Sequence, residues 1–481
     1  RVYTQMIEPL SEVPAGAIRF VNGNRLNVCP VSVMLILEGT PEENGITNYN
    51  TFSGDTMDTN AIWRNNCNLT EPYNFLTTVC LNYANPDCVP AGYTHLSITN
   101  LVPVDPFLGV KEEEYYDLKR RLANEMMEQY IKIGGVDFRG RIAEIEVSTP
   151  MTISHYVGAW KGSIYGYSHS MDNHVIAKKT MMAEDHFIDG LEFAGARRGR
   201  RRAGPADHQR QSRGQGRARR DGSKGGSEMS IRVKSFLKDV GGAGRVTEAR
   251  REKLKSASAV PDPKDPIRDL ADKLHPSEMQ LRVTDIRDAS PTAKTFRFEA
   301  VDGHIPVFQC GQFVNFRLKI GESLLTRPYT ISSAPYEARG EHPFFEITVR
   351  RNVPYLVPDY FFENVHVGDV LTGALPFGTF YWEPLRDTTE LVALAGGSGI
   401  TPFYAMAKEI AHGKMHGCRL TILYGSVKSD DIVLKDKLDQ ICAECPDVKV
   451  VHVLSDDPDW PGEHGFITRE IIEKYAAPNS T

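Results

Sequence analysis

Apolar and polar residues alternate along two segments in the second half of the chain. In residues 315–320 the apolar members are Phe316, Leu318 and Ile320. In residues 345–350 they are Phe345, Ile347 and Val349. A period of two places apolar side chains on one face of a strand and polar side chains on the other. These half-buried strands predict a small antiparallel β-barrel over residues 279–386.

The pattern changes after residue 386. An apolar strand at 391–395 is followed by a helix at 403–412, a strand at 420–424, a helix at 432–442 and a strand at 448–454. Strands that alternate with helices are typical of a parallel sheet. Residues 387–481 therefore predict a parallel α/β domain.

A positive charge, an aromatic ring and several hydroxyl groups occur together in one short segment, Arg327-Pro328-Tyr329-Thr330-Ile331-Ser332-Ser333. A guanidinium group binds phosphate in a fixed geometry, and the ring and hydroxyls suit a planar ligand rich in hydrogen-bonding atoms. A flavin nucleotide is such a ligand. The segment therefore predicts a flavin site.

A second motif, Gly396-Gly397-Ser398-Gly399-Ile400-Thr401-Pro402, directly follows the apolar strand at 391–395. Glycines at this position let backbone N–H groups approach a pyrophosphate at the start of a helix. Thr401 and Pro402 suit the first turn of that helix. The order of the two motifs, flavin segment first and glycine turn second, predicts redox chemistry with a nicotinamide cofactor.

Residues 279–481 resemble the ferredoxin-NADP reductase superfamily. Three further segments carry the resemblance: Gly311-Gln312-Phe313-Val314, Gly368-Asp369-Val370 and Pro376-Phe377-Gly378-Thr379-Phe380. The resemblance implies a flavin-binding barrel followed by an NAD(P)-binding domain. It also implies that Arg327 holds the flavin phosphate, that Tyr329 packs on the isoalloxazine and that Thr330 bonds near N5, which makes Tyr329 and Thr330 the expected catalytic residues.

The same resemblance implies cofactor contacts from both domains. The expected residues are Pro328, Ser332, Val349, Arg350, Gly378, the turn Gly396, Gly397, Ser398, Gly399, Ile400, Thr401 and Pro402, and then Ser426 and Lys428. No metal site is expected in this chain. The implied function is transfer of electrons from NAD(P)H through the flavin to an iron–sulfur protein or domain.

Two departures from the family pattern leave the cofactors open. Where the family places a Gly and a Ser or Thr against the diphosphate, this chain has residues 354–359, and Pro358 offers neither a hydroxyl nor an N–H. FAD and FMN therefore both remain. Near the expected adenosine ribose, Lys428 stands without an Arg, which favours NADH over NADPH. Because no Cys-Gly-Pro segment follows residue 454, we expect the nucleotide domain to be truncated and a continuation or partner to carry any 2Fe-2S cluster.

Residues 1–196 resemble the C-terminal half of phytoene desaturase-like FAD oxidoreductases. The resemblance is carried by Pro90–Leu96, Ser148–Ile153, Gly162–Gly166 and Gly190–Gly195. It implies a partial α+β region that reduces or isomerises a hydrophobic polyene, although the family's N-terminal Gly-x-Gly-x-x-Gly turn is missing. The other interpretation is an unrelated α/β scaffold with a strand at 93–98 and an amphipathic helix at 112–133.

Residues 197–228 are rich in arginine and contain no aliphatic residue larger than alanine before residue 221. Such a composition cannot build a core, so we expect a disordered junction. We interpret it as a frameshift or read-through between two bacterial genes, and expect no nucleic-acid partner. The alternative is a basic arm that binds nucleic acid. Residues 229–278 then predict a helical lead-in, with a short amphipathic helix at 267–274.

The remaining composition is that of an ordinary globular protein. The formal net charge is −6 and 41% of the residues are hydrophobic. Eight scattered cysteines suit a reducing cytoplasm, and the Cys442–Cys445 pair lacks the second pair that a zinc or iron–sulfur site needs. No segment approaches the length of a membrane span. We therefore expect a soluble, cytoplasmic flavoprotein.

Overall fold

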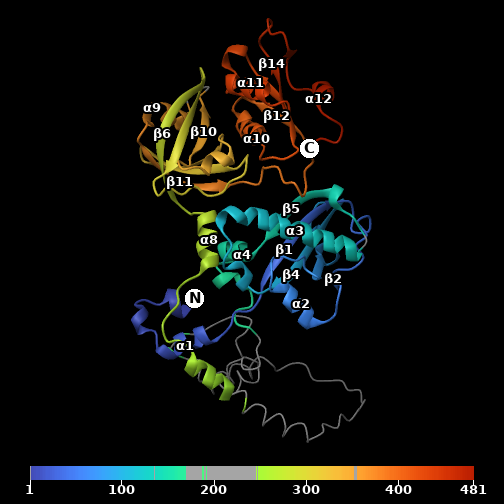
Figure 1. Cartoon of the computed structure of the whole chain (residues 1–481). Coiled ribbons are helices and arrows are strands. Elements are labelled where there is room, and N and C mark those ends of the chain that lie inside the picture. Colours follow the sequence, from blue (N-terminus) through green and yellow to red (C-terminus); the bar gives the residue numbers. More distant parts are fainter. Residues whose placement is uncertain are drawn as a thin grey trace, which may run out of the picture.

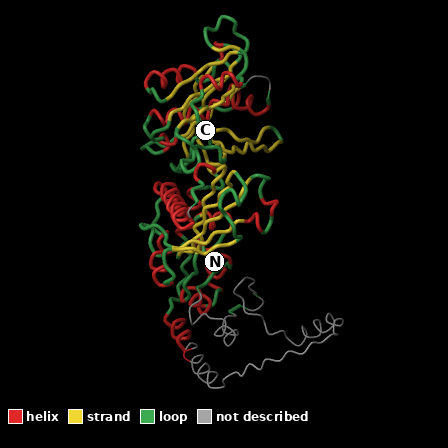
Figure 2. The backbone as a smooth tube through the Cα atoms, turned by 90° about the vertical axis from the view of Figure 1, so that its right-hand side faces the viewer, coloured by secondary structure: helices red, strands yellow, loops and turns green. Residues whose placement is uncertain are grey.

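The computed structural model describes residues 2–134, 136–168, 187–188, 191, 245, 248–351 and 355–481. Three sheets organise the described residues (Figure 1). The first belongs to an N-terminal unit, residues 2–168. Figures 1 and 2 both place this unit below the two C-terminal units. The predicted Arg-rich junction and most of the Gly190–Gly195 segment lie outside the described residues.

The N-terminal unit contains a five-stranded antiparallel sheet in the order β2-β3-β4-β1-β5. Its strands are β1 (Cys29–Glu38), β2 (Asn50–Gly54), β3 (Phe75–Cys80), β4 (Tyr93–Val102) and β5 (Ile142–Ser148). In β1 every second side chain from Val31 to Leu37, including Val33 and Leu35, is fully buried. The predicted strand at 93–98 is confirmed and extends to Val102. The predicted helix at 112–133 is confirmed as α3 (Glu112–Gly134), whose Leu122 and Met126 complete the core of this sheet.

A helix from a distant part of the sequence belongs to this same core. Three shorter helices of the unit are α1 (Ala15–Gly23), α2 (Thr59–Asn66) and α4 (Pro150–Val157). The predicted helix at 267–274 forms as α8 (Pro266–Leu274). Its Ile267 and Leu274 are buried in the same core cluster as the apolar side chains of β1. Its Arg268 donates a hydrogen bond to the carbonyl of Ser154 at 2.9 Å. Thus α8, expected as a lead-in to the domain after it, packs on the unit before it.

The second sheet has six antiparallel strands in the order β10-β7-β6-β11-β8-β9. They are β6 (Met279–Ser290), β7 (Ala293–Ala300), β8 (Phe313–Ile320), β9 (Ser323–Thr330), β10 (Phe345–Arg350) and β11 (Val370–Phe377). A bridge between Ile331 and Ile347 brings the two end strands together. Helix α9 (Leu356–Asn364) packs Phe361 against the sheet's aromatic core.

The alternation predicted for residues 315–320 is confirmed in β8, but the one predicted for 345–350 is wrong. In β10 the polar residues are buried as well: Glu346 is 4% exposed and Thr348 is 6% exposed. Glu346 accepts from Arg287 at 2.5 Å and from Arg297 at 2.9 Å. Because these arginines come from β6 and β7, both faces of β10 are covered by partners that the strand's own sequence does not reveal.

The third sheet is parallel, in the order β12-β13-β14-β15. Its elements are β12 (Glu390–Gly396), α10 (Thr401–Ala411), β13 (Arg419–Ser426), α11 (Lys435–Glu444), β14 (Val448–Leu454), β15 (Glu463–His464) and α12 (Arg469–Tyr475). The predicted strands and the first helix are confirmed. The second helix starts at Lys435, three residues later than predicted, because Leu434 adopts a left-handed φ of 61° and donates its N–H to Ala289 of β6. The short strand β15 was not predicted.

Within the described ranges, no helix combines the length and the apolar character that crossing a membrane requires. All eight cysteines lie in these ranges and are free thiols. The described residues also contain no cluster of three or more His, Cys, Asp or Glu side chains arranged to hold a metal ion.

Replacing Ile267 by Ala tests the placement of α8. Ile267 is fully buried, so the substitution should lower the free energy of unfolding of the N-terminal unit by about 2 to 5 kcal/mol. Urea denaturation followed by tryptophan fluorescence measures the change. Lys273→Ala, an exposed position on the same helix, is the control and should stay within about 0.5 kcal/mol. Equal unfolding midpoints for the two variants would contradict the placement.

Candidate functional site

The segment predicted to hold a flavin forms the end of β9, which is an edge strand of the six-stranded sheet. An edge tolerates Pro328, which has no N–H for a further ladder bond. Arg327 is exposed, and its Nη1 donates to the neighbouring carbonyl of Thr326 at 2.8 Å. A guanidinium has five N–H donors, so most of this donor set faces solvent. Arg327 is therefore free to bind an anionic group.

The ring of Tyr329 is held in one orientation by the core of the sheet. It meets Phe361 edge-on at a centroid distance of 5.1 Å and Phe316 at 6.3 Å. Burial raises the pKa of Tyr329 to about 12, so the phenol keeps its proton at neutral pH. Tyr329 and the next residue, Thr330, are both half-buried. The two therefore present a fixed ring and a hydroxyl at the same strand end.

Two other predicted contacts lie inside the sheet. Ser332 is 1% exposed, and its hydroxyl accepts from Thr348 at 3.1 Å. Thr348 in turn shares a hydrogen bond with Thr295 at 3.0 Å. Val349 is 1% exposed and packs in the core. The side chains of Ser332 and Val349 are thus used for packing, and a cofactor contact there would depend on the backbone.

The predicted glycine turn follows β12 as a 3₁₀ turn, Gly397–Ile400, that leads into α10. Gly396 and Gly399 are exposed, and a side chain added at either would meet open space. The turn is fixed from beneath, because the Tyr424 hydroxyl is directed at the carbonyl of Gly397 at 2.9 Å and Ile400 is fully buried. A fixed turn with open space above its glycines can receive a pyrophosphate.

The first turn of α10 is arranged as the sequence predicts. The Thr401 hydroxyl donates to the carbonyl of Ser398 at 3.2 Å, and Pro402 occupies the first turn. On the neighbouring strand, Ser426 ends β13 half-buried and Lys428 is exposed beyond it. These residues share the carboxyl edge of the parallel sheet with the glycines, because Gly396 pairs with Gly425.

Arg350, a predicted cofactor contact, joins the two C-terminal sheets. Its Nη2 donates to Asp431 at 2.7 Å, and Asp431 also accepts from Ser290 at 2.6 Å and from Thr292 at 2.8 Å. We call these four residues the interlobe cluster. Asp431 is therefore hydrogen bonded within the protein and is not a solvated surface carboxylate. Nothing local in the sequence marks it, because its partners lie at least 81 residues away.

The environment of Asp431 sets its charge. Burial alone would raise the pKa of this carboxyl, but hydrogen bonds from Ser290, Thr292 and Arg350 outweigh burial and lower the pKa. The carboxylate is therefore ionised at neutral pH. Its contribution to stability is present above the ordinary pKa of about 4 and is lost as the pH falls through the lowered value.

The interlobe cluster also brings the two motifs together. Ile331, directly after the flavin segment, pairs with Ile347 of β10. Arg350 ends the same strand, and its Nη1 lies 2.6 Å from where a Cβ on Gly397 would stand. Three residues of strand span roughly 10 Å. The flavin segment and the glycine turn are thus connected through β10 and the side chain of Arg350.

The last predicted contact, Gly378, lies on another side of the sheet. It has a φ of +98°, and a Cβ there would stand 2.9 Å from the Phe313 ring. Its carbonyl accepts from the Gln312 side chain at 2.9 Å. Two residues further along the chain, Phe380 meets Phe403 of α10 edge-on at a centroid distance of 5.9 Å.

In comparisons with known proteins, the C-terminal region is similar to oxidoreductases. Residues 393–481 match the family of oxidoreductase NAD-binding domains. The chain is 32% identical over 194 residues to NADH-cytochrome b5 reductase 1 of Candida glabrata, covering 38% of this chain and 64% of the relative. It is 27% identical over 197 residues to ferredoxin–NADP reductase B of Sorangium cellulosum, covering 41% of this chain and 78% of the relative.

A further relative and two solved structures complete the comparison. NADH-cytochrome b5 reductase 1 of Dictyostelium discoideum is 30% identical over 165 residues, covering 34% of this chain and 55% of the relative. The Amycolatopsis cytochrome P450 reductase GcoB has a TM-score of 0.37 at 23% identity, covering 42% of this chain and 59% of that one. The cytochrome b5 reductase domain of Ulva prolifera nitrate reductase has a TM-score of 0.37 at 21% identity, covering 42% and 85%.

The chain spans 64% and 55% of the lengths of the two b5 reductases named above. The similarity to ferredoxin-NADP and cytochrome b5 reductases therefore supports the family resemblance predicted for the C-terminal region. The resemblance of residues 1–196 to phytoene desaturase-like proteins stays a prediction.

Replacing Asp431 by Ala should weaken the contact between the two C-terminal sheets. The change removes charge-assisted hydrogen bonds and leaves Arg350 without its carboxylate, so we expect a loss of about 2 kcal/mol in the free energy of unfolding at pH 7. Urea denaturation monitored through Trp382 and Trp460 measures it. The difference from the parent should begin to shrink as the pH falls below the ordinary carboxyl pKa of about 4, and it should be lost as the pH falls through the lowered pKa of Asp431.

Asp430→Ala is the matched control for this experiment. Asp430 is the adjacent carboxylate and is exposed, so its loss should change stability by less than about 0.5 kcal/mol. A destabilisation of the same size in both variants would show that the interlobe cluster does not depend on Asp431.

Proposed function

We propose that residues 279–481 form an NADH-dependent flavin oxidoreductase. In this proposal NADH binds at the glycine turn and gives its hydride to a flavin held at the end of β9. The observation that supports the proposal is the position of Arg350, which ends β10, donates to Asp431 and lies against Gly397 of the glycine turn. Hydride transfer depends on reacting atoms about 3 to 3.5 Å apart, so a fixed junction between the two lobes suits the reaction.

The residues present fit a flavin. Arg327 has unused donors for a phosphate, Tyr329 offers a ring fixed by Phe361, and Thr330 adds a hydroxyl beside it. A bound flavin would supply the ring that accepts a hydride and releases electrons one at a time. The chain's own part is to bind and orient: Arg327 holds the phosphate, Tyr329 sets the plane of the ring and Thr330 donates a hydrogen bond at its edge.

The glycine turn would hold the second cofactor. Backbone N–H groups at the start of α10 favour the negative charge of a pyrophosphate, and Gly396 and Gly399 leave the space for it. We propose NADH rather than NADPH because Lys428 is the one basic residue near the end of β13, and because relatives at 32% and 30% identity are named NADH-cytochrome b5 reductases.

The form of the flavin and the acceptor are further parts of this proposal. We propose FAD, with its diphosphate near the start of α9. Pro358 in this segment has no N–H, so other groups of the segment would have to bind the diphosphate. For the acceptor we propose a protein that carries one electron at a time. The sequence led us to expect an iron–sulfur protein, whereas the names of the relatives favour a cytochrome b5. A cytoplasmic location stays a prediction, because one relative is named as plasma membrane-associated.

Replacing Arg327 by Ala should lower the affinity for flavin. Loss of a charge-assisted contact costs about 1.5 to 3 kcal/mol, which corresponds to roughly a tenfold to hundredfold weaker Kd. Equilibrium dialysis against FAD and against FMN measures the change and also separates the two cofactors. Arg282→Ala, an exposed arginine on β6, is the control. Equal retention of flavin by both variants would place the flavin site elsewhere.

Replacing Gly399 by Asp tests the nicotinamide site without disturbing the fold. A side chain at this position meets open space, so the variant should fold normally, but its carboxylate would repel a pyrophosphate. We expect bleaching of bound flavin in a stopped-flow experiment to need at least about tenfold more NADH, a difference of about 1.4 kcal/mol in binding. Gly340→Asp also enters open space and is the control. Unchanged NADH dependence in Gly399→Asp would contradict binding at this turn.

A further inference from the structure

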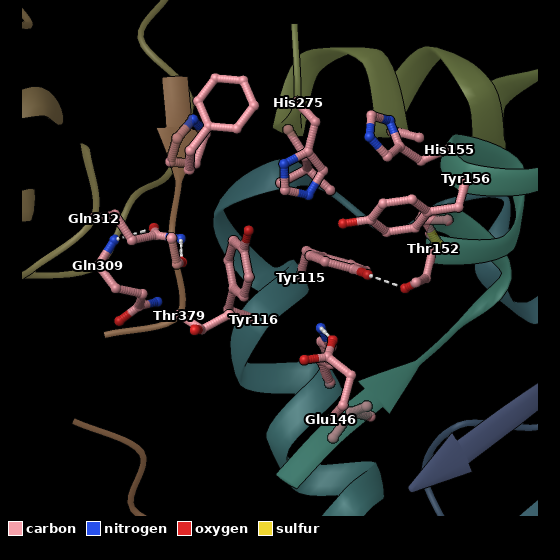
Figure 3. Close-up of a pocket in the computed structure, with 18 of the residues that line it drawn as sticks. Tyr115, Tyr116, Glu146, Thr152, His155, Tyr156, His275, Gln309, Gln312 and Thr379 are labelled. Carbon is pink, nitrogen blue, oxygen red and sulfur yellow. Dashed lines mark hydrogen bonds and ion pairs between the residues drawn. The ribbon is translucent and has the colours of Figure 1, made fainter. Parts of the chain in front are cut away.

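A pocket of about 800 Å³ lies between the N-terminal unit and the six-stranded sheet. Its walls come from α3, α4, α8 and the end of β11 (Figure 3). This volume falls in the range of pockets that hold small organic molecules. None of the residues proposed above to bind flavin or NADH lines it, apart from Gly378. The pocket is therefore separate from the glycine turn.

Three polar side chains in the pocket have hydrogen-bonding capacity that the protein does not use. Within the described residues, the Tyr116 hydroxyl and the His275 ring make no hydrogen bond, and His155 Nδ1 is buried without a partner. Figure 3 shows Tyr116 and His275 directed toward the same space. By contrast, the Tyr115 hydroxyl is already bonded to Thr149 at 2.9 Å.

The two histidines are uncharged at neutral pH. Their rings lie 4.9 Å apart, and burial lowers the pKa of both, that of His275 to about 4. A neutral imidazole has one N–H donor and one acceptor nitrogen. Together with the phenol of Tyr116, the pair can therefore both donate to and accept from the oxygen atoms of a ligand.

The charged residues at the rim are paired with one another. The pairs are Lys119 with Glu146 at 3.9 Å, Arg120 with Glu383 at 3.5 Å, Arg268 with Asp272 at 2.8 Å and Glu278 with Arg317 at 2.8 Å. No charge of either sign is left in excess among them. An ionic ligand would thus bring a charge into the pocket without a free counterion, which is costly.

The other walls are aromatic and aliphatic. Tyr156 stands at the mouth, 79% exposed, and Leu274 and Leu375 are buried beneath. On the side of the sheet, Phe377 stacks on Phe313 at a centroid distance of 5.9 Å. Phe313 of β8 is the strand partner of Thr330 at the end of β9. The wall residue Phe377 is therefore connected to the end of β9 through Phe313.

We propose that this pocket binds an uncharged aromatic molecule that carries hydroxyl or carbonyl groups on its ring. The ligand's oxygen atoms hydrogen bond to Tyr116, His155 and His275, and its ring packs on the apolar walls. The site is a property of the joined units, because α3, α4 and α8 supply one side and β11 supplies the other. It requires neither flavin nor NADH.

Isothermal titration calorimetry of the full chain with 2-naphthol tests the proposal. We expect saturable binding at one site. Tyr116→Phe and His275→Phe each remove one hydrogen-bonding group and should weaken the Kd roughly three- to tenfold. Tyr49→Phe and His366→Phe are matched controls, since Tyr49 and His366 are exposed and lie outside the pocket, and both should bind like the parent.

A ligand series on the parent protein needs no variant and guards against misfolding. Naphthalene, which has no oxygen, and 2-naphthoate, which is an anion, should both bind at least roughly threefold more weakly than 2-naphthol. Three results would overturn the proposal: absence of saturable 2-naphthol binding, equal affinity for the three ligands, or equal loss of affinity in the pocket variants and the controls.

Discussion

The ion pair between Arg350 and Asp431 joins the two C-terminal sheets, together with the pair Lys408–Glu337 and the stacking of Tyr336 on His412 at 3.9 Å. Both side chains are mostly buried, with 14% and 21% of their surface exposed, and Ser290 and Thr292 complete the hydrogen bonds of the carboxylate. A mostly buried ion pair adds little net stability, because the cost of removing both charges from water offsets their attraction. Removing one partner, however, leaves the other charge buried without compensation. The pair therefore fixes an arrangement more than it adds stability. Gly397 belongs to the same constraint, because a side chain there would collide with the guanidinium.

The parts of the fold that depend on local chemistry could be predicted from the sequence. Period-two alternation located β8, and the apolar run before the glycines located β12. What failed depends on distant partners. Glu346 is buried because Arg287 of β6 and Arg297 of β7 reach it. Helix α11 begins later than predicted because the N–H of Leu434 bonds to Ala289 of β6. No pattern within ten or fifteen residues contains this information.

The candidate site divides in the same way. The residue types of the flavin segment and the glycine turn carry their chemistry within a few positions, so both could be found, and the turn has the exposure that binding needs. The ion pair of Arg350 could not be predicted, because its partner Asp431 lies 81 residues further along the chain. Likewise His155 and His275 look like isolated histidines in the sequence, and only the packing of α8 on α4 brings their rings to 4.9 Å.

The position of the N-terminal unit follows from the length of a connection. Helix α8 ends at Leu274 inside the core of that unit, and β6 begins at Met279, so four residues join the two. Leu385 packs against the core of the N-terminal unit. Polar contacts across the junction include Glu112 with His304 at 2.8 Å, Arg120 with Glu383 at 3.5 Å and Glu144 with Arg386 at 3.1 Å. Exposed pairs of this kind contribute at most about 1 kcal/mol each. A short connection anchored at both ends restricts the two units more strongly than such contacts do. The pocket between them therefore owes its shape chiefly to the covalent path from α8 to β6.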